Sequence, residues 1–61
     1  MAILINPEMV QCGDQISINN NPVMVTYISK DIHGFDTYVK DTTGNTSHVF
    51  IPEEDKVKLI G

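Results

Sequence analysis

The chain has 61 residues with four lysines, no arginine and eight acidic residues, which gives a formal net charge of −4. This length allows one domain, which we take as residues 1–61. Cations are needed to displace the counterions of nucleic acids or to bind anionic membranes, so the acidic balance argues against both partners. No apolar run approaches the roughly 20 residues of a membrane span, and no secretory leader pattern is present. We therefore expect a soluble cytoplasmic protein, located in the host cytoplasm if it is viral.

The N-terminal residues 1–9 are predicted to form a short strand or an arm. The apolar run Ala2, Ile3, Leu4 and Ile5 ends at Asn6-Pro7, because a proline pushes the residue before it into an extended or turn conformation. An apolar arm can add a strand to the open sheet edge of a neighbouring molecule. One helical turn is expected within Pro7–Gln11, with Asn6 as its cap.

Five runs of alternating polar and apolar residues follow and predict five strands, because side chains along a strand point to opposite faces every second residue. Asn19-Asn20-Asn21 predicts a turn, and Asp41–Asn45 with Gly44 predicts a hairpin loop. Pro52–Asp55 is expected to form a tight helical turn before the last strand. The strands are Gln15–Asn19, Val23–Ser29, Phe35–Lys40, Thr46–Ile51 and Lys56–Ile60.

The second of these runs is apolar on both faces. Strict alternation puts Val23, Val25 and Tyr27 on one face and Met24 with Ile28 on the other. Such a pattern predicts a strand in the centre of a sheet, where the curvature of a small barrel buries both sides; the alternative is that the N-terminal arm or a partner covers one side. The sequence as a whole therefore predicts an all-β fold, a small five-stranded barrel that is closed or nearly closed.

The entry Gly13–Ile18 and the end Ile51–Ile60, with its proline, short turn and valine-containing last strand, resemble the Src-homology-three-like barrel superfamily. The resemblance implies a barrel spanning about Val10–Gly61. Members that bind proline-rich peptides use an aromatic groove, whereas this chain has no tryptophan and only four aromatic residues. Ribosomal members are basic, which this chain is not. The fold alone therefore selects no function.

Metal, cofactor and catalytic sites are not expected. Cys12, His33 and His48 stand singly, without the paired spacings of zinc ligands, and a lone cysteine makes no internal disulfide. Asp31 and Asp36 flank one loop but lack the oxygen spacing of a calcium site. A catalytic set combining His48 with Asp36 or Asp41 and a serine can be written down, but nothing in the sequence places these groups together. We expect a protein without enzymatic activity.

The remaining candidates are residues for contact with another protein. Exposed aromatic side chains with a charged rim are typical of interfaces, and an acidic turn can dock on a basic patch. We therefore predict a non-catalytic interaction module, an accessory or host-interacting factor of a bacterium or phage, that binds another protein or its own copies. The alternative is a homo-oligomeric or virion component that assembles through Ala2–Ile5. The predicted contact residues are Tyr27, Tyr38, Phe50, Glu53, Glu54 and Asp55.

Overall fold

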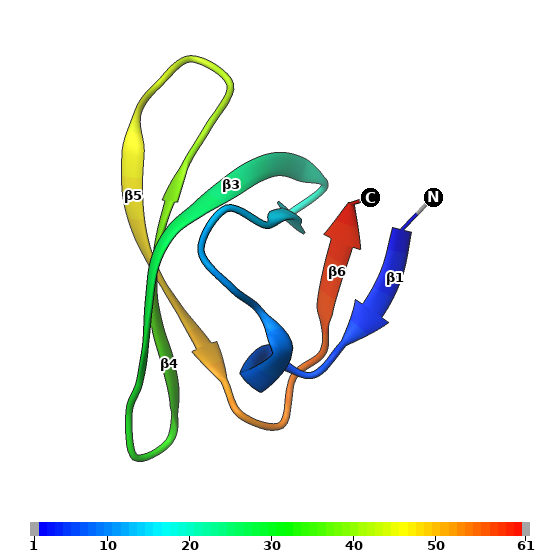
Figure 1. Cartoon of the computed structure of the whole chain (residues 1–61), viewed down its shortest axis with the longest axis vertical. Coiled ribbons are helices and arrows are strands. Elements are labelled where there is room, and N and C mark those ends of the chain that lie inside the picture. The colour runs from blue at the N-terminus through cyan, green and yellow to red at the C-terminus, as the bar shows by residue number, and fades with distance from the viewer. Residues whose placement is uncertain (1, 61) are drawn as a thin grey trace.

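The computed structural model describes residues 2–60 and contains six strands and one short 3-10 helix (Figure 1). The prediction of an all-β fold is confirmed, and the five predicted strands lie within one or two residues of their observed bounds. The sixth strand comes from the N-terminal residues. The elements are β1 (Ala2–Ile5), η1 (Pro7–Met9), β2 (Gln15–Ile18), β3 (Asn21–Lys30), β4 (Gly34–Lys40), β5 (Thr46–Pro52) and β6 (Val57–Ile60).

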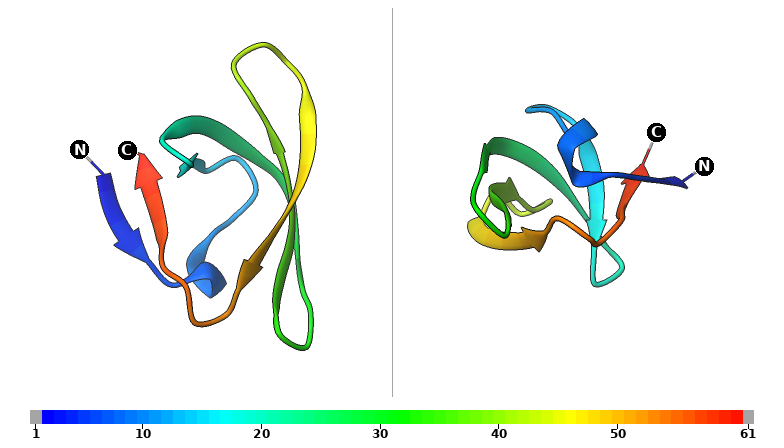
Figure 2. Two further views of the ribbon diagram at one scale, coloured as in Figure 1. Left: turned by 180° about the vertical axis from the view of Figure 1, so that it is seen from behind. Right: turned by 90° about the horizontal axis from the view of Figure 1, so that it is seen from below.

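The strands form one antiparallel sheet in the order β1-β6-β2-β3-β4-β5 (Figure 2). The prediction of a closed or nearly closed five-stranded barrel is not met, because the sheet has six strands and is not closed into a barrel. The reason lies in β1, which pairs with β6 along Ala2–Ile5 and occupies the side of β6 that faces away from β2. Within the described residues, β1 and β5 are the two edges of the sheet.

The N-terminal segment is part of the fold and not a free arm. Pro7 and Val10 are buried, and the predicted helical turn is present as η1, with Pro7 at its first position. Asn6 precedes this turn without a side-chain cap hydrogen bond, because its Oδ1 accepts a hydrogen bond from Lys56 Nζ instead. This bond ties the start of the chain to the segment that leads into β6.

A β-bulge in β3 overturns the predicted alternation of that strand. Val25 pairs with Val39, but the next pair along is Tyr27 with Tyr38, so Thr26 is the extra residue. An inserted residue shifts every later side chain to the other face of a strand. Tyr27 therefore faces solvent, where strict alternation had placed it beside Val25.

Two predicted turns are confirmed. Asn19 and Asn20 have positive φ values of 51° and 67°, the conformation that the tight β2–β3 turn requires and that asparagine tolerates. The β4–β5 hairpin loop contains Gly44 at φ 93°.

The helical turn expected at Pro52–Asp55 is wrong. Pro52 still belongs to β5, and the Asp55 amide donates to the Pro52 carbonyl (3.1 Å) in a single β-turn. The Glu53 amide donates instead to the carbonyl of His33 (3.1 Å). This bond ties the turn to the β3–β4 loop.

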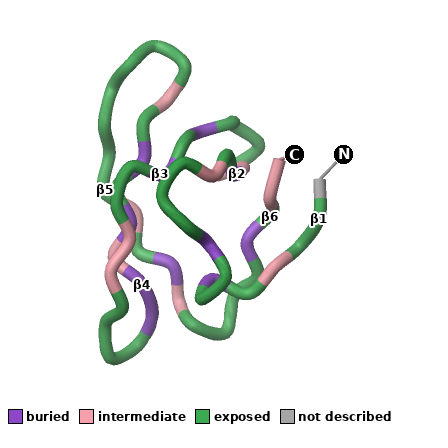
Figure 3. The backbone as a smooth tube through the Cα atoms, viewed as in Figure 1, coloured by how far each residue is buried: buried purple, intermediate pink, exposed green. Residues whose placement is uncertain are grey.

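The core is formed by buried residues of β2, β3, β4, β5 and β6 together with Val10, and Figure 3 marks where the buried residues lie along the chain. Thr37 is the buried polar residue among them, with no measurable exposure and no hydrogen-bond partner for its Oγ1 among the described residues. Its cross-strand neighbours are Ile28 and Val49, which both pack against the core. The core residues are Val10, Ile16, Val23, Val25, Val39, Ile51 and Val57.

Gly34, at the start of β4, is a position where a side chain does not fit. A Cβ atom there would lie 2.8 Å from Cζ of Phe50 and 2.9 Å from Cα of Pro52, and closer still to the carbonyl oxygen of Ile51. Close backbone approach to β5 therefore requires glycine.

Candidate functional site

The convex side of β3, β4 and β5 carries a set of large side chains that do not contribute to the core. We call this surface the outer aromatic face. Pairing across the three strands arranges it in rows: Tyr27, Tyr38 and His48 are directly opposite one another. The neighbouring rows are Met24, Lys40 and Thr46 on one side, and Ser29, Asp36 and Phe50 on the other.

The central row is a chain of three ring systems. The rings of Tyr27 and Tyr38 meet edge to face with centroids 6.0 Å apart, and the rings of Tyr38 and His48 are 4.9 Å apart at a tilt of 42°. Aromatic cross-strand pairs of this kind stabilise a sheet by about 0.5–1.5 kcal/mol. The bulge residue Thr26 adds a link between β3 and β4 at this row, because its Oγ1 donates to the backbone carbonyl oxygen of Tyr38 (3.0 Å).

The rings are nevertheless only partly covered. The side chains of Met24, Tyr27, Tyr38 and Phe50 are 41–54% exposed. Exposed apolar side chains that cluster on one face are common at interaction surfaces.

Asp36 lies in the middle of this face, on the central strand β4. Its Oδ1 is 3.2 Å from Nε2 of His48, and both side chains are about half exposed. Phe50 is its direct neighbour on β5, and Ser29 is its neighbour on β3. The carboxylate therefore has a ring on one side of its row, a hydroxyl on the other, and the imidazole of His48 within hydrogen-bond distance.

The sequence-predicted contact residues divide into two groups. Tyr27, Tyr38 and Phe50 are exposed, as expected, and lie on one face. The acidic turn Glu53–Asp55 lies beyond the end of β5, where Glu53 forms an exposed ion pair with Lys30 (3.9 Å). Exposed pairs of this type contribute little to stability.

Sequence reasoning missed Asp36, His48 and Met24 as members of the face. The signal was present in the hairpin loop Asp41–Asn45, because Lys40 pairs with Thr46 on either side of it. Counting two and four residues outward along both strands places Tyr38 opposite His48 and Asp36 opposite Phe50.

Two other candidate aspartates serve the loops in which they lie. Asp31 Oδ1 accepts a hydrogen bond from the amide of Ile32 (2.7 Å). Asp41 Oδ1 accepts from the hydroxyl of Thr43 (2.7 Å) and from the amides of Thr43 and Asn45 (2.9 Å each). The hydroxyl of Thr43, followed by the amide of Asn45, holds the pKa of Asp41 below its ordinary value.

Within residues 2–60, no three His, Cys, Asp or Glu side chains converge as metal ligands, and no helix is long and apolar enough to cross a membrane. Cys12 and His33 are exposed and lie outside the outer aromatic face. His48 and Asp36 lie within hydrogen-bond distance, so one pair of the hypothetical catalytic set is present. In the part of the chain that the structure describes, however, no serine or threonine hydroxyl is hydrogen-bonded to His48.

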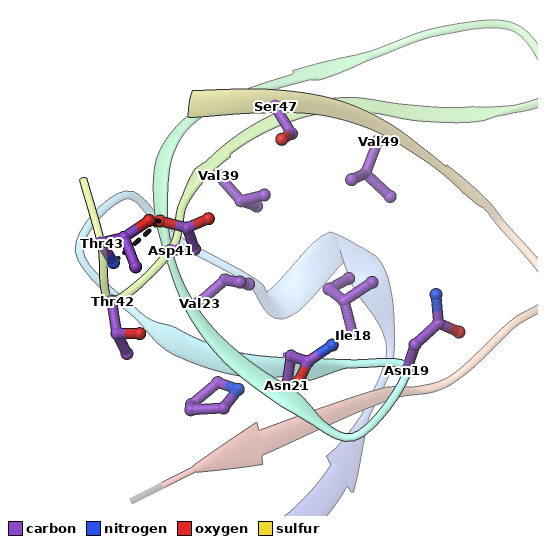
Figure 4. A pocket seen from close by; sticks show the side chains of 11 residues that line it. Ile18, Asn19, Asn21, Val23, Val39, Asp41, Thr42, Thr43, Ser47 and Val49 are labelled. Atoms are coloured by element: carbon purple, nitrogen blue, oxygen red, sulfur yellow. Dashed lines mark hydrogen bonds between the residues drawn. The ribbon is translucent and has the colours of Figure 1, made fainter. Parts of the chain in front are cut away.

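A groove of about 410 Å³ opens on the concave side, between the β2–β3 turn and the β4–β5 hairpin loop (Figure 4). Val39 and Val49 reach into it from one side, and Val23 and Ile18 from the other. Val23 and Val39 are themselves core residues. The groove is therefore the uncovered end of the core, with a rim of polar loop side chains.

Comparison of the chain with protein-family models, curated proteins and solved structures finds no match. The candidate site thus stands on its own geometry.

Proposed function

We propose that this protein is a non-catalytic interaction module that binds another protein through the outer aromatic face. The observation that carries the proposal is the set of four large, half-exposed side chains, Met24, Tyr27, Tyr38 and Phe50, on one face of three adjacent strands. Aromatic residues and methionine are enriched at protein interfaces, and they supply most of the binding energy when a partner covers them. The rim is polar, as interface rims are.

The rigidity of the face supports the same proposal. It is built on paired strands and not on loops. Ring contacts with Tyr27 and His48 pack against the Tyr38 side chain, and the Thr26 hydroxyl bonds its backbone carbonyl. A preformed aromatic surface loses little side-chain entropy when it binds. The acidic turn Glu53–Asp55 lies beyond this surface and adds long-range attraction for a basic partner.

The test is capture from an extract of the cells that express the protein. We compare wild type with a variant that carries Tyr27→Thr and Tyr38→Thr, substitutions that keep strand propensity while removing the rings. The matched control is Ile32→Thr, because Ile32 is 79% exposed in the β3–β4 loop and lies outside the face. Thermal unfolding shows whether each variant is folded at the assay temperature.

The proposal predicts a protein that wild type and Ile32→Thr retain in equal amounts and that the double variant loses at least tenfold, about 1.4 kcal/mol of binding free energy. Equal retention by the folded double variant would refute it.

Self-association through β1 is the second candidate. The observation that favours it is that β1 is an edge strand without a charged residue, on which Ile3 and Leu4 are 54% and 65% exposed. Unprotected apolar edges are templates for pairing with another chain. Because β1 also pairs with β6, deleting it would damage the sheet, and a charged residue at the edge is the better test.

The variant for this test is Leu4→Lys, studied by size-exclusion chromatography with light scattering. Assembly through β1 predicts an oligomer for wild type and a monomer for Leu4→Lys. A wild-type monomer, or an oligomer that Leu4→Lys leaves intact, would exclude this candidate.

A further inference from the structure

The proposed interaction face has a chemical preference that its central carboxylate defines. Asp36 occupies the middle strand of the face, opposite Phe50 and two residues from Tyr38. Diagonal neighbours on adjacent strands lie about 7–8 Å apart, within reach of long side chains, and for Asp36 they include Tyr27, His48 and Pro52. Three aromatic side chains and one imidazole therefore lie beside this carboxylate, along its own row and in the row of Tyr38.

Unlike the carboxylates of Asp31, Asp41 and Glu53, the carboxylate of Asp36 is bonded neither to a backbone amide nor to a lysine among the described residues. Asp31 and Asp41 accept hydrogen bonds from backbone amides of their own loops, and Glu53 is paired with Lys30. Asp36 has His48 as its side-chain partner, and no lysine of the described residues is within ion-pair distance of it. Its side chain remains 41% exposed.

A group that fits both features is a planar cation. The faces of aromatic rings attract cations, with a preference for groups within about 6 Å of the ring centroid. A carboxylate beside them adds charge-assisted hydrogen bonds. The face is open and not a closed cage, so a guanidinium, which is weakly hydrated and stacks flat on a ring, fits better than a strongly hydrated ammonium group.

We infer that the outer aromatic face binds an arginine side chain of a partner protein, with the guanidinium stacked on the tyrosine rings and hydrogen-bonded to Asp36. The inference rests on the proposed function and deepens it. The chain itself has no arginine and carries a net charge of −4. A second copy therefore cannot supply the group, and the arginine comes from a different, basic protein.

The test is a nuclear magnetic resonance titration of the full ¹⁵N-labelled chain with three blocked pentapeptides. They have the sequence Gly-Ser-X-Ser-Gly, where X is arginine, lysine or citrulline. Citrulline has nearly the shape of arginine but no charge. The inference predicts that the arginine peptide shifts the amide signals of Tyr27, Asp36, Tyr38 and His48, that it binds at least tenfold more tightly than the citrulline peptide, and that the lysine peptide lies between them.

Two variants separate recognition by Asp36 from general attraction of a cation by an acidic protein. Asp36→Asn and Glu8→Gln each remove one negative charge, but Glu8 is exposed on η1, away from the face. We expect Asp36→Asn to weaken binding of the arginine peptide at least fivefold, and Glu8→Gln to leave it within a factor of two. Both variants are first shown to be folded by their spectra.

Three results would overturn the inference: equal affinity for the arginine and citrulline peptides, equal losses in the two variants, or no shifts at a peptide concentration of about 10 mM. None of these results refutes the interaction face itself. If the double tyrosine variant loses its captured protein while the peptides bind equally, the face is an interface that recognises something other than arginine. If the folded double variant keeps its captured protein, the proposed function fails.

Discussion

Thr37→Val is expected to stabilise this protein, although it removes a hydroxyl group from the middle of the sheet. Thr37 has no measurable exposure, and its Oγ1 has no hydrogen-bond partner among the described residues. Its neighbours across β3 and β5 are Ile28 and Val49, which pack against the core. Valine has nearly the same shape and places a methyl group where the hydroxyl had been.

The magnitude follows from the cost of a buried hydroxyl that makes no hydrogen bond. Mutational data place that cost at about 1–3 kcal/mol, and we expect Thr37→Val to recover about 1 kcal/mol of it. For a domain of this size, 1 kcal/mol changes the unfolding midpoint Tm by about 4–8 °C. Thr37→Ser keeps the hydroxyl and loses the methyl group, so it is expected to destabilise the protein by about 1 kcal/mol.

The assay is thermal and urea unfolding followed by circular dichroism, with Thr26→Val as a matched control. The Thr26 hydroxyl is exposed and bonded to the carbonyl of Tyr38, so its loss is expected to lower the free energy of unfolding by about 0.5–1 kcal/mol. We therefore expect the free energy of unfolding to rise in Thr37→Val and to fall in Thr26→Val. A lower Tm for Thr37→Val would mean that the wild-type Thr37 hydroxyl makes a stabilising hydrogen bond in solution, and would refute the prediction.

Three further predictions concern backbone conformation and charge, and each is tested by measuring the Tm of the variant. Gly34→Ala is expected to lower the free energy of unfolding by at least ~3 kcal/mol, because β5 leaves no room for a Cβ. Gly13→Ala, in open space at φ 95°, is expected to lower it by about 1 kcal/mol. Similar losses of stability in the two variants would contradict this account of packing. Asn20→Gly is expected to add about 0.5 kcal/mol, since glycine adopts the positive φ of this turn more readily, and a lower Tm would contradict that explanation. Asp41→Asn is expected to lower the Tm at pH 7. Because the pKa of Asp41 is lowered in the fold, its carboxylate stabilises the protein at pH values above the ordinary pKa of 3.8, and this contribution is lost as the pH falls through the folded-state pKa. The difference in Tm from wild type should therefore shrink as the pH falls below 3.8; a difference independent of pH would exclude this mechanism.

Much of the sheet could be predicted because its residues obey local rules. Alternation located the strands, while Asn19-Asn20 and Gly44 located the turns, since these positions need a positive φ. These are properties of short segments, and tertiary contacts did not override them.

The errors arose where pairing between distant segments decides the structure. The open sheet depends on β1 meeting β6, a contact between the two ends of the chain. The bulge at Thr26 has no glycine to mark it, so the outward direction of Tyr27 could not follow from strict alternation. The turn at Pro52–Asp55 is held by a bond from Glu53 to the carbonyl of His33, which no local pattern reveals.

For the candidate site, residue type predicted part of the surface and strand register supplied the rest. Tyr27, Tyr38 and Phe50 could be named because large aromatic side chains stood at solvent-facing or ambiguous positions. The contact between Asp36 and His48 depends on the register of β4 against β5. One additional residue in the loop between these strands would have moved the side chains of β5 to the opposite face relative to β4.

The most direct test of the central claim is photo-crosslinking from position 27. A benzoylphenylalanine replaces Tyr27 in the full chain, irradiation takes place in an extract of the expressing cells, and mass spectrometry identifies the crosslinked residue. Leu4, on the exposed edge strand β1, receives the same probe as the comparison site. The account predicts that position 27 crosslinks to one different protein, within a few residues of an arginine. Crosslinks from position 27 only to a second copy of this chain, or none while Leu4 crosslinks efficiently, would contradict it.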